Sequence, residues 1–291
     1  MNKLIDSKSV SELENIHLII DAYLENLPEN VSHCKVDIFG NSFIDHISGN
    51  IKINTISWGT KIRVIDGKVT IKSIHSYSQI ENILGKTSIG LIKDHVEIGK
   101  ISDEVSITNI CENVSIICIG GNSRIDKILG KVSIGRMLNK SFIRSIEDNA
   151  RIGDMENESL IESMKGSSLV ITMNDFSKVT LADENCNVTY MRGDSVINKA
   201  MGRSLIEKME GNSKIELLSE LSVVNYVSET SNIKHIDGFS SVIYAENKNS
   251  IGSIGTFAKL AANKMENPEI DASIYGPVFH KVTLLNRRIA R

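Results

Sequence analysis

The sequence lacks proline over most of its length and lacks any long apolar run. The three prolines are Pro28, Pro268 and Pro277, so residues 40–264 contain none. A proline inside a sheet would remove a hydrogen bond from the strand ladder, so this absence permits continuous β-structure across 40–264. No stretch approaches the roughly 18 apolar residues of a membrane span, and we expect no membrane partner.

Neither the charge balance nor the spacing of the cysteines predicts a ligand. The formal net charge is −3, and residues 40–264 carry 26 basic against 26 acidic residues, which argues against a nucleic-acid partner. Cys34, Cys111, Cys118 and Cys186 lack the spacing of metal ligands, so we expect reduced thiols. The N-terminus has no basic segment followed by an apolar one, so we expect no secretion by a signal peptide.

What the sequence contains is a repeat of nine residues. Residues 40–264 divide into twenty-five consecutive blocks without an insertion or deletion, and the block at 40–48 reads GNSFIDHIS. The fifth position is aliphatic in every block, and the eighth is apolar in all but the last. The third is Ser in thirteen blocks, and the first is Gly in eleven. A fixed short period over this length predicts one elongated solenoid.

Each block predicts a strand and its bends. Side chains alternate across a strand, so the third and fifth positions point inward together, and the step of three residues to the eighth requires a bend. Glycine at the first position supplies a second bend that needs a positive φ. The prediction is an all-β fold, a single-stranded β-solenoid of nine-residue repeats over residues 40–264. Serines at the third position are interpreted as packing elements bonded to the backbone, not as nucleophiles.

Both ends of the solenoid are predicted to be capped. Within residues 1–39, apolar residues at spacings of three and four, with a capping box of Ser9 and Glu12, predict a helix over 9–27 that ends at Pro28. A short lead-in strand follows. Residues 265–291 are predicted to form a C-terminal cap segment. Such caps cover the apolar cross-section and the open strand edges of the terminal coils.

Two series of side chains indicate how many blocks close one coil. Outward side chains recur at steps of eighteen residues at the second and the seventh positions. The second-position series is Leu221, Phe239, Phe257 and Tyr275, and the seventh-position series is Tyr190, Lys208, Tyr226 and Tyr244. Two blocks per coil would align each series along one face, which favours eighteen residues per coil, twelve and a half coils and a rod about 60 Å long. Twenty-seven residues per coil is the alternative.

The repeat resembles a family of tandem nonapeptide arrays. Blocks 148–156, DNARIGDME, and 193–201, GDSVINKAM, are similar to arrays found in proteins of bacteriophages and Gram-positive prophages. The family has no established activity, so the resemblance implies only a phage setting, with the protein in the host cytoplasm or in the virion. The calcium-binding nonapeptide of repeat-in-toxin proteins shares the period, but its glycines and aspartate are absent, so we predict no calcium.

The sequence predicts no catalytic residue, no cofactor-binding residue and no metal ligand. Solenoid enzymes build their sites on loops between coils, and an unbroken period leaves no room for such loops. The seven histidines are dispersed along the chain. We therefore expect a protein that is not an enzyme.

Binding is the remaining class of function. Both outward series are candidate partner-binding residues, because rows of exposed aromatic and apolar side chains suit a protein surface. We predict a non-catalytic interaction protein that binds a protein partner or itself as a homodimer, either as a particle component or as an inhibitor of a host defence protein. The alternative is a tail-associated β-helical enzyme or adhesin that acts on polysaccharide. Residues 265–291 are a further candidate to cover the apolar row.

Overall fold

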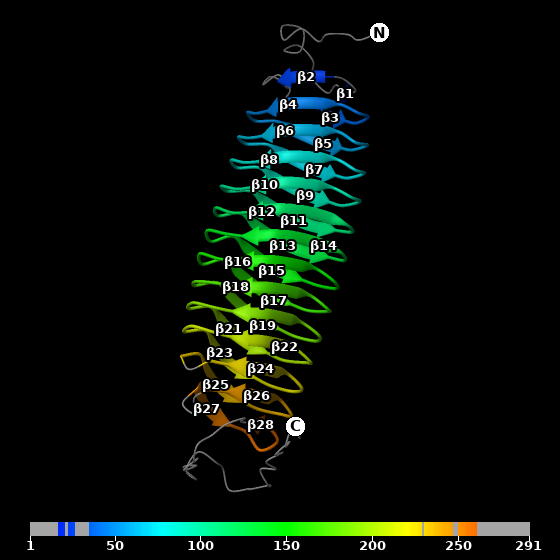
Figure 1. Ribbon diagram of the computed structural model, residues 1–291. Coiled ribbons are helices and arrows are strands. Elements are labelled where there is room, and N and C mark those ends of the chain that lie inside the picture. Colours follow the sequence, from blue (N-terminus) through cyan, green and yellow to red (C-terminus); the bar gives the residue numbers. More distant parts are fainter. Residues whose placement is uncertain (1–16, 21–22, 27–34, 229, 247–249, 261–291) are drawn as a thin grey trace, which may run out of the picture.

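The computed structural model describes residues 17–20, 23–26, 35–228, 230–246 and 250–260, and in these ranges the regular structure is entirely β. The strands form two parallel sheets of fourteen strands each, and the two sheets run the length of a rod (Figure 1). Neighbours within a sheet are alternate strands of the sequence, so each coil contributes one strand to each sheet. The predicted β-solenoid is confirmed.

The first sheet contains the odd-numbered strands: β1 (His17–Ile20), β3 (Lys35–Ile38), β5 (Lys52–Ile56), β7 (Thr70–Ile74), β9 (Ser88–Ile92), β11 (Ser106–Cys111), β13 (Arg124–Leu129), β15 (Phe142–Ile146), β17 (Leu160–Met164), β19 (Lys178–Ala182), β21 (Val196–Ala200), β23 (Lys214–Leu218), β25 (Asn232–Ile236) and β27 (Ile251–Ile254). The second sheet contains the even-numbered strands: β2 (Tyr23–Asn26), β4 (Phe43–Ile47), β6 (Lys61–Ile65), β8 (Gln79–Ile83), β10 (Glu97–Ile101), β12 (Val114–Ile119), β14 (Val132–Met137), β16 (Arg151–Met155), β18 (Leu169–Met173), β20 (Asn187–Met191), β22 (Leu205–Met209), β24 (Val223–Val227), β26 (Ser241–Ala245) and β28 (Lys259–Leu260).

The strand register fixes the length of a coil. Ile71 pairs with Ile89 in the first sheet, and Ile62 pairs with Ile80 in the second, so equivalent residues lie eighteen apart. The prediction of eighteen residues per coil is confirmed, and the alternative of twenty-seven is wrong. The register shifts once between Val36 and the next residue, where the lead-in strand β3 joins the regular coils.

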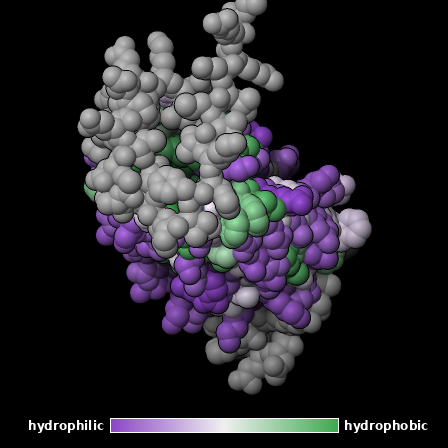
Figure 2. Space-filling model, turned by 90° about the horizontal axis from the view of Figure 1, so that it is seen from below, coloured by the Kyte–Doolittle hydropathy of each residue, from purple (hydrophilic) through white to green (hydrophobic). Residues whose placement is uncertain are grey.

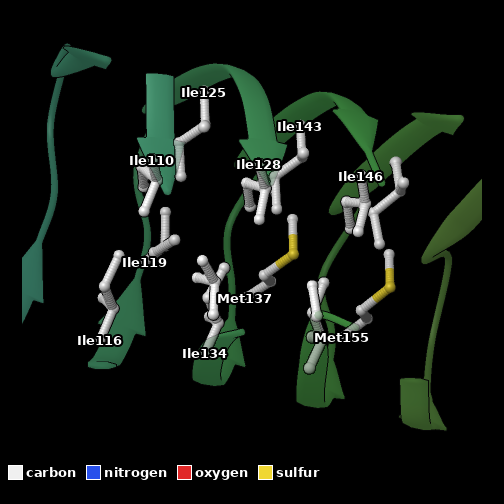
Figure 3. Close-up of a cluster of buried hydrophobic side chains, with 14 of the residues drawn as sticks. Ile110, Ile116, Ile119, Ile125, Ile128, Ile134, Met137, Ile143, Ile146 and Met155 are labelled. Carbon is white, nitrogen blue, oxygen red and sulfur yellow. The ribbon is translucent and has the colours of Figure 1, made fainter. Parts of the chain in front are cut away.

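The inside of the rod is apolar and the outside is polar. Figure 2, seen from the C-terminal end, shows mostly hydrophilic side chains on the outer surface. Figure 3 shows the filling between the sheets, where Ile110 and Ile128 of the first sheet point toward Ile119 and Met137 of the second. These four side chains are fully buried. Burial of each stabilises the fold by about 1.5–3 kcal/mol, so the regular core is the main source of stability.

The turns take the left-handed conformation that the first-position glycines predicted. Acidic residues also take it, and their carboxylates bind the coil before: the N–H of Gly166 donates to Glu184 at 2.9 Å, and that of Gly202 donates to Glu220 at 3.0 Å. Successive turns lie so close that a Cβ on Gly202 would be 2.4 Å from the backbone nitrogen of Glu184. Glycine therefore alternates with an acidic residue in this part of the rod for steric as well as conformational reasons.

The N-terminal helix is wrong where the structure describes the chain. Residues 17–20 and 23–26 form β1 and β2, which pair with β3 and β4. A solenoid coil also spaces its apolar residues by three, from the fifth to the eighth position, and by four, from the eighth to the next third position. The open edge of the first coil offers unpaired backbone groups, so pairing overrides the helical signal. The rest of 9–27, the segment 265–291 and its Tyr275 lie outside the described residues.

The third-position serines fall into two groups. The hydroxyls of Ser78, Ser168 and Ser204 each donate to a carbonyl three residues earlier at 2.7 Å, which confirms the predicted backbone bonding for this group. In the second group the buried hydroxyls have no hydrogen-bond partner among the described residues; its third-position members are Ser123, Ser141, Ser159, Ser177, Ser195 and Ser222. The first group contributes a hydrogen bond to stability, whereas the second contributes only packing volume.

Candidate functional site

Turns join the two sheets along two edges of the rod (Figure 1), and the sequence gives the two edges different side chains. We name the turns that lead from the first sheet to the second the aromatic edge, and the turns that lead back the polar edge. Leu221, Phe239 and Phe257 lie in successive turns of the aromatic edge, between β23 and β28. The backbone N–H of Phe239 donates to Glu220 in the turn before at 2.7 Å, so the turns are tied together.

The side chains of Leu221, Phe239 and Phe257 form an exposed apolar row, as the sequence predicted. Their side chains are 50%, 66% and 61% exposed. The rings of Phe239 and Phe257 stack at 5.2 Å between centroids with an interplanar angle of 26°. Figure 2 shows hydrophobic surface among the hydrophilic side chains at this end of the rod. A contiguous apolar row on a polar surface is typical of a binding site.

A second aromatic group lies on the same edge near the N-terminal end, and sequence reasoning missed it. Trp58 is 69% exposed and Tyr77 is 66% exposed. The Tyr77 ring stacks on His95 of the next turn at 4.8 Å and 12°. The eighteen-residue step from Tyr77 to His95, at the second position of the block, was the signal that could have found it.

The histidines are less dispersed than the sequence suggested. His75 and His95 belong to successive turns of the aromatic edge, and Asp94 directly precedes His95. Burial lowers the pKa of His75, and the charge of Asp94 partly offsets that shift. The Nδ1 atom of His75 lies 2.9 Å from the hydroxyl of Ser76.

The backbone beneath this second group is strained. Trp58, Tyr77 and His95 have φ values of 58°, 62° and 62°, in the left-handed region that glycine and asparagine normally occupy. Each such residue costs about 1–2 kcal/mol relative to ordinary backbone. The same conformation occurs at polar turn residues such as Lys140 and Glu158, so it belongs to the turn of the solenoid, and the exposure of the rings is what marks this group as a candidate binding surface.

The tyrosine series forms a column on the second sheet, also as predicted. Tyr190 pairs with Lys208, Lys208 with Tyr226, and Tyr226 with Tyr244. The Tyr226 and Tyr244 rings stack at 5.3 Å and 11°, and the ammonium of Lys208 lies 5.2 Å from the centre of the Tyr226 ring. The guanidinium of Arg192 lies 4.9 Å from the centre of the Tyr190 ring.

The Tyr226 hydroxyl and two cations of the tyrosine column are bound within the rod. The Tyr226 hydroxyl donates to the Glu246 carboxylate, and this hydrogen bond, with smaller effects of burial and charge, raises the pKa of Tyr226 to about 12. Lys208 and Arg192 both bind Glu210, the latter at 3.1 Å. The column is half-buried and its side chains hold one another. The column therefore contributes to the stability of the rod, and its side chains are less available to a partner.

The polar edge carries charge pairs where the aromatic edge carries rings. Lys86 lies 3.3 Å from Glu104, and Lys140 lies 3.6 Å from Glu158, each pair joining successive coils. Phe176, which is 65% exposed, is an apolar exception on this edge. Exposed pairs of this kind contribute less than about 1 kcal/mol each, so they keep the edge soluble without adding much stability.

A surface hollow and a buried thiol are among the chemical features of the described residues. No group of three or more His, Cys, Asp or Glu side chains among them could hold a metal ion. A hollow of about 710 Å³ on the second sheet is lined by residues that include Gly99, Lys100, Ile117 and Arg136. Burial raises the pKa of the free thiol of Cys186 to about 11, so its reactive thiolate is scarce at neutral pH.

Comparison with known proteins finds no match: no family model, no curated protein and no solved structure corresponds to the chain. No helix with the length and apolar character of a membrane span occurs in the described part of the chain.

Proposed function

We propose that the protein is a non-catalytic rod whose aromatic edge binds a protein partner, either another protein or a second copy of this chain. The observation that carries this proposal is the row of Leu221, Phe239 and Phe257, which leaves apolar side chains half to two-thirds exposed in successive coils. Aromatic side chains on a rigid support lose little entropy on binding and dominate the energy of many protein interfaces.

The aromatic edge is a better binding surface than the tyrosine column on the second sheet. The Tyr226 hydroxyl and the charges of Lys208 and Arg192 already have partners within the rod. A partner that bound there would have to replace those contacts, whereas the side chains of the Phe239 row have no polar group to desolvate. The apolar row therefore gains more free energy when a protein covers it.

The biological setting rests on the resemblance of the nine-residue blocks to phage and prophage arrays. The rod acts in the host cytoplasm or in the virion, as a particle component or as an inhibitor of a host defence protein. Both roles use the same property, which is a stiff scaffold that presents a fixed row of side chains.

The test is affinity purification of the tagged full chain from infected or prophage-carrying cells, with mass spectrometry of the proteins recovered. The proposal expects at least one stoichiometric protein with the wild type. Phe239→Ser/Phe257→Ser should lose it, and Lys140→Ser/Glu158→Ser on the polar edge should keep it. Virion proteins would indicate a particle component, and a single host protein would indicate an inhibitor. Equal recovery by both double variants would contradict the proposal.

A further inference from the structure

We propose that the aromatic edge binds a second copy of this chain, with the two rods side by side and running in opposite directions. This inference rests on the proposed function and names the partner of the same surface. The two apolar groups of the edge lie toward its opposite ends, around Tyr77 and around Phe239. In an antiparallel pair, each group of one rod meets the other group of its partner.

A single two-fold axis aligns both groups at once. If the axis passes between the turns at 148–149 and 166–167, Tyr77 lies opposite Phe239. The same axis sets the Trp58 turn opposite the Phe257 turn. Because every regular coil contributes eighteen residues and one strand to each sheet, one aligned pair of turns also sets which other turns face each other. A two-fold interface is self-complementary, so each contact occurs twice.

The charges between the two apolar groups fit the same axis. It sets Glu112 opposite Arg203, and it sets Lys131 opposite Glu184. All four side chains are exposed on the aromatic edge. Opposite charges therefore face each other at two positions in each half of the interface, which favours this partner over one that matches the apolar row alone.

Other registers are electrostatically worse. A shift of one coil in one direction sets Lys131 opposite Arg203, and a shift in the other direction sets Glu112 opposite Glu184. The favoured register contains one pair of like charge, Asp94 opposite Glu220. Asp94 lies 3.3 Å from Lys93 of its own chain, and this lysine offsets part of the repulsion. The charge pattern thus selects one alignment of the two rods.

Antiparallel pairing also covers the exposed rings of the N-terminal group. Trp58 and Tyr77 keep bulky exposed rings on left-handed backbone, although glycine or asparagine would be less strained there. In the pair these rings are covered by the row that contains Phe239 and Phe257. Burial of the two rings removes apolar surface from water, which favours the pair.

Charge reversal in the full chain tests the pairing, with self-association measured by sedimentation equilibrium over a concentration series. Glu112→Arg and Arg203→Glu should each weaken dimerisation about tenfold or more, because each sets like charges opposite at two symmetric places. The double variant Glu112→Arg/Arg203→Glu should restore dimerisation to near the wild-type level. Glu104→Arg on the polar edge is the control and should leave dimerisation unchanged.

The outcomes separate this inference from the proposed function. In a parallel pair Glu112 would face its own copy, so single reversals without effect would overturn the antiparallel arrangement. A wild type that stays monomeric at all concentrations, while Phe239→Ser/Phe257→Ser still loses another protein in the affinity purification, would overturn the second copy and leave the proposed function standing. Failure of both tests would overturn both.

Discussion

The two edges of the rod are built on the same turn and present opposite surfaces. On the polar edge, Lys86 and Glu104 pair along the axis at 3.3 Å. On the aromatic edge, Phe239 and Phe257 occupy the same position of the turn and stack at 5.2 Å. The difference shows that the solenoid accepts either charged or aromatic side chains at the second position of the block. The choice of side chain there therefore indicates what the surface binds.

The same comparison separates the aromatic edge from the tyrosine column. Both contain stacked rings eighteen residues apart, but Tyr226 bonds to Glu246 and Lys208 bonds to Glu210 within the rod. The rings of the Phe239 row are exposed and carry no polar group to bind. Stacked aromatic residues on a solenoid are thus of two kinds, and the hydrogen-bond partners around them distinguish the kinds.

The largest predicted effect is on association. Phe239→Ser/Phe257→Ser should weaken association through the aromatic edge at least about 1,000-fold, because each ring is placed as a binding hot spot. The free energy of unfolding should change by less than about 1 kcal/mol, because both side chains are exposed. Light scattering and urea unfolding measure the two quantities. A large loss of stability with unchanged association would show that the row belongs to the fold.

The next effect concerns the turns of the aromatic edge. Gly202→Ala should destabilise the rod by about 3 kcal/mol, because the new Cβ would lie 2.4 Å from the backbone nitrogen of Glu184. Gly130→Ala is the matched control on the same edge, with a φ of 74° and its nearest atom at 3.5 Å. It should cost only about 1 kcal/mol. Equal losses in urea unfolding would mean that close packing of the turns is unimportant.

A smaller effect distinguishes the two groups of third-position serines. Ser168→Ala should cost about 1 kcal/mol, because it removes a hydrogen bond of 2.7 Å to the carbonyl of Lys165. Ser159→Ala should be neutral or stabilising, because its buried hydroxyl has no hydrogen-bond partner among the described residues. Urea unfolding of the two variants side by side gives the answer. The reverse order would contradict the assignment.

The smallest effect tests the tyrosine column. The pKa of Tyr226 is raised to about 12 from the model-compound value of 10.0, so the neutral hydroxyl is favoured in the fold. Its stabilising effect is fully present below about pH 10 and is lost as the pH rises through about 12. Tyrosinate absorbance should show one tyrosine that titrates late, and Glu246→Gln should bring that titration back toward 10. An unchanged titration in Glu246→Gln would show that this hydrogen bond does not cause the raised pKa.

Much of the fold was predictable, because the solenoid repeats one simple rule. The inward third, fifth and eighth positions gave the two-sheet core, and the steps between Leu221, Phe239 and Phe257 gave eighteen residues per coil. The helix predicted over 9–27 was wrong at 17–20 and 23–26, because a coil spaces its apolar residues by three and four, as a helix does. Only the open strand edge of the next coil, which is a tertiary feature, decides between them.

The candidate site was only half predictable. The C-terminal row was visible in the sequence as a series at the second position. Trp58 was not predicted as a site residue because it stands at the first position of its block. Tyr77 was not predicted because the next residue of its series is a histidine. The sequence also did not predict the hydrogen bonds and ion pairs that bind the tyrosine column within the rod. They involve Arg192, Glu210 and Glu246, which stand at the ninth position of their blocks. Their side chains reach the column only through a bend whose geometry the period does not specify.

The most direct test of the central claim is a photocrosslink from Phe239 in living cells. The full chain is made with benzoylphenylalanine at position 239, and with the same residue at Tyr226 as the control, and the crosslinked peptides are identified by mass spectrometry. If the aromatic edge binds a partner, we expect crosslinks from position 239 to another protein chain, with peptides around Tyr77 of a second copy among them. We expect few crosslinks from position 226. Crosslinks from position 239 that stay within the same chain, for example to residues 265–291, would contradict the claim.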